Sequence, residues 1–159
     1  MSAGKKTIKT TGLDELIQKL ETMTPNTEII CEDVAYEGIN VIADEMKSQL
    51  NSIKTTSDES YSTSTRNAYA WEKEALVDGM GISPVRNDNG LIDYKVGFDG
   101  YVDRNGTKKA VALIANSINA GTSFMPAQPF VKKTVSAGRK AAIAAMEAAL
   151  SEQIDKYMK

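Results

Sequence analysis

The sequence contains no histidine and a single cysteine, Cys31, among its 159 residues. The absence of histidine excludes Ser-His-Asp and Cys-His nucleophile pairs, histidine-ligated zinc and imidazole acid–base chemistry. One cysteine cannot form an internal disulfide or hold a thiolate zinc or iron–sulfur site. Because Cys31 lies among Ile29, Ile30 and Val34, we expect a small buried side chain in a protein that folds in a reducing cytoplasm.

Long apolar runs are also missing, because none approaches the length of about 18 residues that a membrane-spanning helix needs. Residues 1–6 carry positive charge, but no apolar run follows, so they do not resemble a secretory signal. Hydrophobic residues make up 42% of the chain and charged residues 25%, which is typical of a globular protein. We therefore expect one domain over residues 1–159 and no membrane partner.

No group of carboxylates has the pattern of a catalytic or metal site. No two carboxylates lie together among apolar residues, where burial would raise the pKa of one of them. Asp99 to Asp103 lacks the ligand spacing of an EF-hand, and Gly79-x-Gly81 is followed by Pro84 rather than by a helix. The sequence therefore predicts a protein that is not an enzyme, with no metal and no cofactor.

The net charge of −2 is spread unevenly along the chain. Residues 1–53 carry five basic and nine acidic side chains, whereas residues 130–159 carry six and three. Opposite charge at the two ends can favour head-to-tail contact between copies. The chain does not resemble a nucleic-acid-binding protein, which normally shows a clustered basic face in a basic domain.

A long acidic interval without any lysine or arginine separates Lys19 from Lys47. It indicates either a solvated helix face or a surface that faces a pore or a basic partner. The candidates for the lining of a DNA channel are Glu28, Glu32, Asp33 and Glu37.

Four helices are predicted from apolar spacing. The first covers residues 12–23, and the second runs from about Glu28 to Ile53 with Gly38 inside it, which suggests a close packing approach. A shorter helix covers Ala110 to Ala120. The last runs from about Lys132 to Tyr157 and is rich in alanine, so a partner helix can approach it closely. That partner is either the long second helix or a neighbouring subunit.

Strands are predicted between the long helices. Ala75 to Val77 and Gly81 to Val85 are short candidates, and Leu91 to Phe98 alternates apolar and polar residues. Asn87 to Gly90 predicts a hairpin, because Asn-Gly supplies the residues of a type I′ turn. The expected fold class is α+β, with a small antiparallel sheet packed against two long helices and accompanied by shorter helices. The expected core consists of Leu16, Val34, Ile42, Phe98, Phe130, Ile143, Met146 and Leu150.

Two polar segments lie outside these elements. Residues 1–11 are expected to form a flexible arm or an added edge strand. Residues 54–68 form a long polar loop, which we expect to be disordered in a free monomer and to order against a neighbour in an assembly.

The stretch from Gly121 to Val131 joins the last two helices. Gly121 can adopt a positive φ and end the preceding helix, and two prolines restrict the following chain to extended geometry. The stretch is expected to anchor the last helix or to form an interface. Its candidate residues are Gly121, Thr122, Phe124, Pro126, Pro129 and Phe130.

The segment INAGTSFMPAQPFVKKTV at 118–135, followed by an alanine-rich helix, resembles a segment of the form EYGT-x-PAQPF in one family of phage proteins. GLDELIQKLETM at 12–23 also resembles the first helix of that family. The family comprises tail-component proteins, also called tail-completion or neck proteins, of lambdoid and other long-tailed bacteriophages. The resemblance covers about residues 8–157, and the chain departs from the pattern at 118–120, where members often carry an aromatic residue and a glutamate.

The resemblance implies a structural virion assembly protein at the head–tail junction, which joins connector to tail without cofactor or chemistry. It implies a ring of identical subunits, which could be a hexamer or a dodecamer. The ring would contact head-closure or connector proteins on one side and tail-tube or tail-terminator proteins on the other. Genomic DNA would pass through without specific binding. The protein would reside in the virion and, during assembly, in the host cytoplasm. The alternative is a cytoplasmic regulatory or binding module that uses its basic C-terminal helix.

Overall fold

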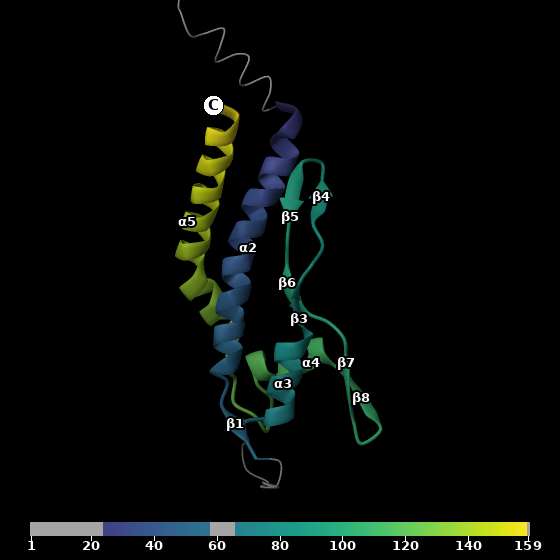
Figure 1. Cartoon of the computed structure of the whole chain (residues 1–159). Helices are drawn as coiled ribbons and strands as arrows, with labels where there is room; N and C mark the ends of the chain where they lie inside the picture. Colours follow the sequence, from purple (N-terminus) through teal and green to yellow (C-terminus); the bar gives the residue numbers. More distant parts are fainter. Residues whose placement is uncertain (1–23, 58–65, 159) are drawn as a thin grey trace, which may run out of the picture.

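Two long antiparallel helices form the spine of the molecule in a computed structural model that describes residues 24–57 and 66–158 (Figure 1). Helix α2 (Thr27–Asn51) follows a 3₁₀ turn, η1 (Thr24–Asn26), and packs along α5 (Phe130–Met158). Helices α3 (Ala70–Gly79) and α4 (Val111–Ala120) pack together at the C-terminal end of α2. The α+β class is confirmed. The predicted first helix with Leu16, the arm 1–11 and most of the loop 54–68 lie outside the described residues.

Glycine allows the two long helices to approach closely at two points. A Cβ built on Gly38 of α2 would lie 2.6 Å from Cγ of Met146 on α5. A Cβ on Gly138 of α5 would lie 3.0 Å from Cδ1 of Ile42 on α2. The predicted close approach at Gly38 and the predicted pairing of the last helix with the second are therefore confirmed within one chain.

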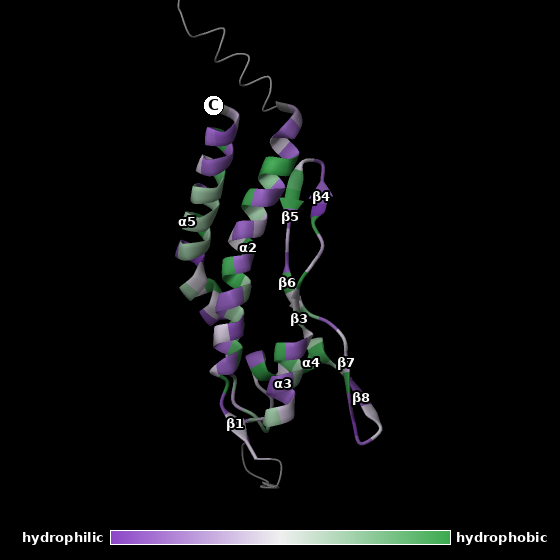
Figure 2. Ribbon diagram, in the orientation of Figure 1, coloured by the Kyte–Doolittle hydropathy of each residue, from purple (hydrophilic) through white to green (hydrophobic). Residues whose placement is uncertain are grey.

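This close approach also explains why part of the expected core is wrong. Helix α5 turns Thr134, Gly138 and Ala142 towards α2, and all three are buried. Ile143 and Leu150 follow Ala142 by one and eight residues, which places them about 100° and 80° further round the helix, on a neighbouring face where they are exposed. Figure 2 shows strongly apolar segments that recur along α2, whereas the alanine-rich middle of α5 is only weakly apolar. Of the remaining expected core residues, Phe130 is buried, and those that are only half-buried are Val34, Ile42, Phe98 and Met146.

The hydrophobic core lies at one end of the molecule, where α2 ends and α5 begins. Leu50 of α2, Leu76 of α3 and Ile118 of α4 are completely buried and belong to one cluster. Met125 and Phe130 complete this cluster from the chain that joins α4 to α5. The loop between these two helices is thus part of the core.

The β structure consists of paired short strands rather than one small sheet. In the described residues β1 (Thr55–Thr56) pairs in parallel with β2 (Ala68–Tyr69). The antiparallel pairs are β3 (Met80–Ile82) with β6 (Val96–Phe98), β4 (Arg86–Asp88) with β5 (Leu91–Asp93), and β7 (Tyr101–Arg104) with β8 (Thr107–Ala110).

Strands β3 to β6 form one long hairpin that is interrupted near its middle. Pro84 has no N–H to donate, so the ladder breaks there and the expected strand from Leu91 to Phe98 is divided in two. The turn itself is confirmed, because Asn89 and Gly90 both have positive φ, at 53° and 86°.

Two further predictions are wrong. Ala75 to Val77 belongs to helix α3, because a three-residue apolar run is too short to indicate its period and its neighbours are strong helix formers. Cys31 is exposed, whereas the adjacent Ile30 is buried, so this turn of α2 directs Ile30 rather than Cys31 into the structure. Within residues 24–57 and 66–158, no helix combines the length and apolar character needed to cross a membrane.

Candidate functional site: the loop between α4 and α5

The loop 121–129 begins with a turn that requires glycine. Gly121 has φ 79° and ψ 170°, and its N–H donates to the carbonyl of Ser117 at 2.9 Å, which ends α4. A Cβ at this position would lie 2.7 Å from the backbone nitrogen of Ala127. Thr122 and Met125 then exchange backbone hydrogen bonds of 2.8 and 3.2 Å. The predicted stop at Gly121 is confirmed, and the loop that follows is tightly folded.

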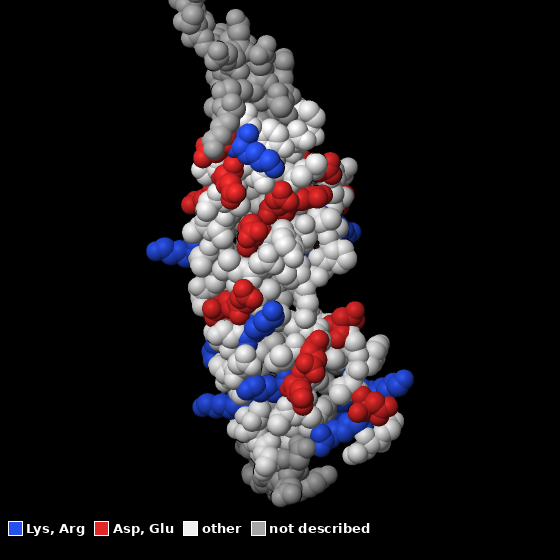
Figure 3. All heavy atoms as spheres, in the orientation of Figure 1, with Lys and Arg blue, Asp and Glu red and all other residues white. Residues whose placement is uncertain are grey.

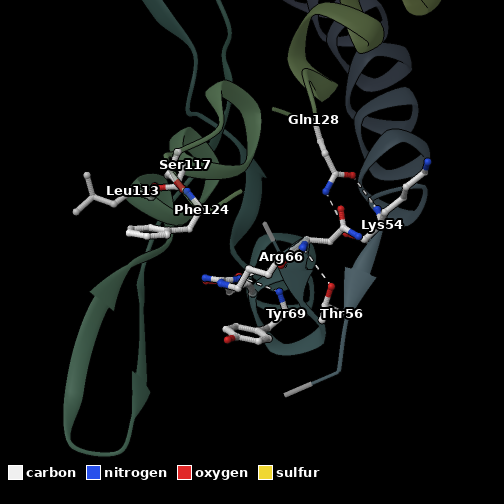
Figure 4. Close-up of polar contacts among 11 residues, drawn as sticks. Lys54, Thr56, Arg66, Tyr69, Leu113, Ser117, Phe124 and Gln128 are labelled. Atoms are coloured by element: carbon white, nitrogen blue, oxygen red, sulfur yellow. Dashed lines mark hydrogen bonds and ion pairs between the residues drawn. The ribbon is translucent and has the colours of Figure 1, made fainter. Parts of the chain in front are cut away.

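Hydrogen bonds fasten this loop to both ends of the polar segment 54–68 (Figure 4). Gln128 Oε1 accepts the backbone N–H of Lys54 at 2.8 Å, and Gln128 Nε2 donates to the Lys54 carbonyl at 3.0 Å. The backbone N–H of Arg66 donates to the carbonyl of Phe124 at 2.8 Å. Because Gln128 also donates its own N–H to Ile118 at 2.9 Å, the loop is held against α4 as well.

The loop divides its apolar side chains between the core and the surface. Met125 and Phe130 are each only 2% exposed, and the Phe130 ring meets Phe98 edge-to-face at 5.8 Å. Phe124, in contrast, is 68% exposed, and Leu113 on α4 is 67% exposed. Figure 4 shows these two side chains extending to the same side of the molecule. We call this pair the Leu113–Phe124 patch.

The predicted loop residues therefore have different environments. Phe130 anchors the last helix, as expected, although it is the first residue of α5 rather than a residue before it. Thr122, Pro126 and Pro129 are exposed together with Phe124. Their role as an interface stays a prediction.

A row of stacked cations and aromatic rings lies next to the loop, and sequence reasoning missed it. The guanidinium of Arg66 lies 3.9 Å from the centroid of the Tyr69 ring, which stacks on Trp71 at 6.3 Å. Arg104 and Lys109 of the β7–β8 hairpin lie 4.8 and 5.3 Å from the Trp71 ring centroid. Each exposed cation–π contact is expected to stabilise the folded protein by about 0.5–1 kcal/mol. The contacts of Arg104 and Lys109 with Trp71 attach the β7–β8 hairpin to α3.

Glu72 organises the start of α3 beneath this row. Its buried carboxylate accepts the backbone N–H of Tyr69 at 2.8 Å and pairs with Arg66 at 3.1 Å. The glutamate therefore caps the helix and compensates the charge of Arg66. The spacing of three residues between Tyr69 and Glu72 is the local signal that could have revealed this cap, but tyrosine is an unusual first residue for it.

The structure separates the four acidic candidates into two pairs on different sides of α2. Glu28 accepts a hydrogen bond from the side chain of Asn87 on β4, and Glu32 is half-buried. Asp33 accepts one from Gln153 of α5 at 3.2 Å. An open groove of about 540 Å³ between the long helices is lined by Asp33, Tyr36, Glu37, Ala148, Glu152 and Gln153.

Tyr94 lies close to one member of each acidic pair, Glu32 and Asp33. Its ring contacts Tyr36 of α2 with centroids 5.8 Å apart. Partial burial, and then the negative charge of Glu32 and Asp33, raise the pKa of the Tyr94 hydroxyl above its usual value. Negative charge therefore gathers near Tyr94 at the N-terminal end of α2. No basic group is among the causes of the raised Tyr94 pKa.

In the described part of the chain, no three His, Cys, Asp or Glu side chains gather in a way that could hold a metal ion. Comparisons of the chain with protein-family models, with curated proteins and with solved structures return no match.

Proposed function

We propose that this protein is a structural assembly protein at the head–tail junction of a long-tailed bacteriophage. It acts there as a neck or tail-completion ring that joins the connector to the tail. Its partners are copies of itself, head-closure or connector proteins on one side, and tail-tube or tail-terminator proteins on the other. It works by forming interfaces, and genomic DNA passes through the ring during packaging and ejection.

The observation that carries this proposal is the Leu113–Phe124 patch. Phe124 lies within the segment that resembles the phage family, and its backbone is fixed by one hydrogen bond, from the Arg66 N–H to the Phe124 carbonyl, and by the turn from Thr122 to Met125. Because the backbone is already ordered, covering this side chain costs only its own rotamer freedom. Aromatic residues with this exposure are typical anchors of protein interfaces.

The position of the patch beside the polar segment supports the same function. Lys54 and Arg66 enclose residues 55–65, and both bind the loop that carries Phe124. A partner that docks on the patch would therefore also lie near Lys54 and Arg66, the described ends of this segment. We expect exposed polar groups around them to contribute hydrogen bonds at the edge of the interface.

Genetic disruption in the phage or prophage that encodes the chain tests the proposal. Without the protein, filled heads and finished tails should accumulate separately, and electron microscopy of the lysate should show few joined particles. Purified protein added to that lysate should restore joining, whereas protein with Phe124→Asp should not. Normal virions from the disrupted gene would refute the proposal.

A second candidate is a cytoplasmic binding module that uses the basic start of α5. The cations on this part of α5 are all exposed, and they are Lys132, Lys133, Arg139 and Lys140. This arrangement suits an acidic partner. Replacing Arg139 and Lys140 by glutamine would abolish the activity of such a module, whereas head–tail joining through the Leu113–Phe124 patch would persist.

A further inference from the structure

One side of α5, next to the face that meets α2, carries an apolar stripe whose residues are exposed in the described part of the chain. Its three residues are Ile143, Leu150 and Ile154, which follow each other at spacings of seven and four and so share one side of the helix. Leu150 is 43% exposed and Ile154 is 37% exposed. Exposed single apolar residues are ordinary, but a row along a helix is typical of a docking surface. We call these residues the α5 stripe.

The stripe and the Leu113–Phe124 patch lie in opposite halves of the molecule. Phe130 begins α5 next to the loop, and Ile154 lies 24 residues further on, which corresponds to about 36 Å at 1.5 Å per residue. A single copy therefore cannot cover its own stripe with its own patch. A contact between the two surfaces must join two copies.

The two halves also differ in charge. Nine acidic and three basic residues lie in the half with the stripe, which comprises residues 27–37, 86–95 and 143–158. Seven acidic and eleven basic residues lie in the other described residues, which include the patch. Figure 3 shows acidic side chains gathered over the upper part of the visible face and most basic ones below. Opposite charge at the two surfaces favours contact between them and disfavours contact of either surface with its own kind.

We propose that the Leu113–Phe124 patch of one copy docks on the α5 stripe of a second copy. This inference rests on the proposed function, because it names the contact through which copies assemble. Phe124 and Leu113 cover Leu150 and Ile154, while Lys108 and Lys109, which precede α4, face Glu147 and Asp155 of the second copy. The two surfaces are different, so the contact is head-to-tail. Each copy keeps one surface free for the next copy, and a ring results if the rotation closes.

Two complementary double variants test this contact. The patch variant carries Leu113→Asp and Phe124→Asp, and the stripe variant carries Leu150→Asp and Ile154→Asp. Leu91→Asp is the matched control, because Leu91 is an exposed leucine of β5 outside both surfaces. Light scattering coupled to size-exclusion chromatography measures the mass of each variant, and circular dichroism confirms that its helices are intact.

The wild type and the Leu91→Asp control should form the same oligomer, while each double variant should have the mass of one chain, 17.2 kDa. An equimolar mixture of the two double variants should form a complex of twice that mass. The patch variant retains a stripe and the stripe variant retains a patch, so one intact contact remains. A wild type that stays monomeric, a double variant that assembles like the wild type, or a mixture that stays monomeric would each overturn the proposal.

Disulfide capture tests the contact without disrupting it. In a Cys31→Ser background, a copy with Phe124→Cys and a copy with Leu150→Cys should form a mixed disulfide far more readily than either forms with itself. Equal yields from all pairings would overturn the proposal. If the chain joins heads to tails through other surfaces, the Asp variants will keep both their oligomer and their joining activity. If the contact is correct but the proposed function is wrong, the mixture will pair while disruption of the gene leaves heads and tails joined.

Discussion

The two ends of this molecule are built in different ways. At the loop end, α2, α3, α4 and the start of α5 enclose a core whose members Leu50, Leu76 and Ile118 are completely buried. At the other end, among residues 24–57 and 66–158, only the two long helices and the tip of one hairpin meet, and Ile29, Leu150 and Ile154 are exposed. The loop end, which also carries the Leu113–Phe124 patch, therefore holds the fold together, whereas the two-helix end has little core of its own. We expect local unfolding to start at the two-helix end.

Phe130→Ala should have the largest effect, because it removes a ring from the centre of the loop-end core. We expect the free energy of unfolding to fall by about 3–5 kcal/mol, measured by chemical denaturation. Phe124→Ala is the matched control, since that phenylalanine is exposed, and its effect should stay within about 0.5 kcal/mol. Equal losses of unfolding free energy for the two substitutions would contradict the assignment of Phe130 to the core and of Phe124 to the surface.

Gly121→Ala should have the next largest effect. At φ 79° and ψ 170° the backbone is in a region that is essentially restricted to glycine, so strain should cost about 1–3 kcal/mol, and contact with Ala127 adds to it. Gly90→Ala serves as the control, because Gly90 also has positive φ but open space around its Cα. The loss of stability at Gly121 should exceed that at Gly90. Equal losses would mean that the loop adjusts to the added methyl group.

Gly38→Val examines the two-helix end, where we expect a loss of about 1–2 kcal/mol, because the valine must displace Met146. Gly81→Val is the control, since a side chain there would meet nothing within 4 Å. Adding Met146→Ala to Gly38→Val should recover part of the loss in a double-mutant cycle. No recovery would show that the cost arises in α2 alone.

Glu32→Lys with Glu37→Lys should have the smallest effect on stability, within about 0.5 kcal/mol. Both residues are candidates for a channel lining. DNA carries one negative charge per about 1.7 Å of its axis, so an acidic wall repels it and a basic wall retains it. A lining role predicts rings that assemble and virions that eject DNA poorly, whereas an interface role predicts no rings. Normal assembly and normal infectivity would show that the acidic face is only solvated.

Local features of the sequence predicted the helices and turns well. The periodicity of α2 and α5, the stop at Gly121 and the turn at Asn89-Gly90 depend on neighbouring residues and their backbone preferences. Helix α3 was missed because the apolar run that suggested a strand there is only three residues long. Strong local signals thus gave correct elements, and short ones did not.

Burial and contacts were harder to predict because they depend on distant partners. Helix α5 is apolar on two sides, and only the close approach at Gly38 and Gly138 decides which side faces α2. The pairing of Gln128 with Lys54 joins residues 74 positions apart, and no local pattern indicates it. The exposure of Phe124, on which the candidate site depends, follows from the same tertiary fold of the loop.

The fastening of Lys54 and Arg66 to one loop has a practical consequence for the chain between them. Gln128 holds the first residue and the Phe124 carbonyl holds the second, so the two ends of this segment are fixed relative to each other by the core. Closing a longer segment between fixed ends costs only about 0.6 kcal/mol for each doubling of its length. An epitope tag inserted between residues 58 and 65 should therefore leave the fold intact. If the proposed function is correct, such a tag would mark the position of each subunit in electron micrographs of a virion.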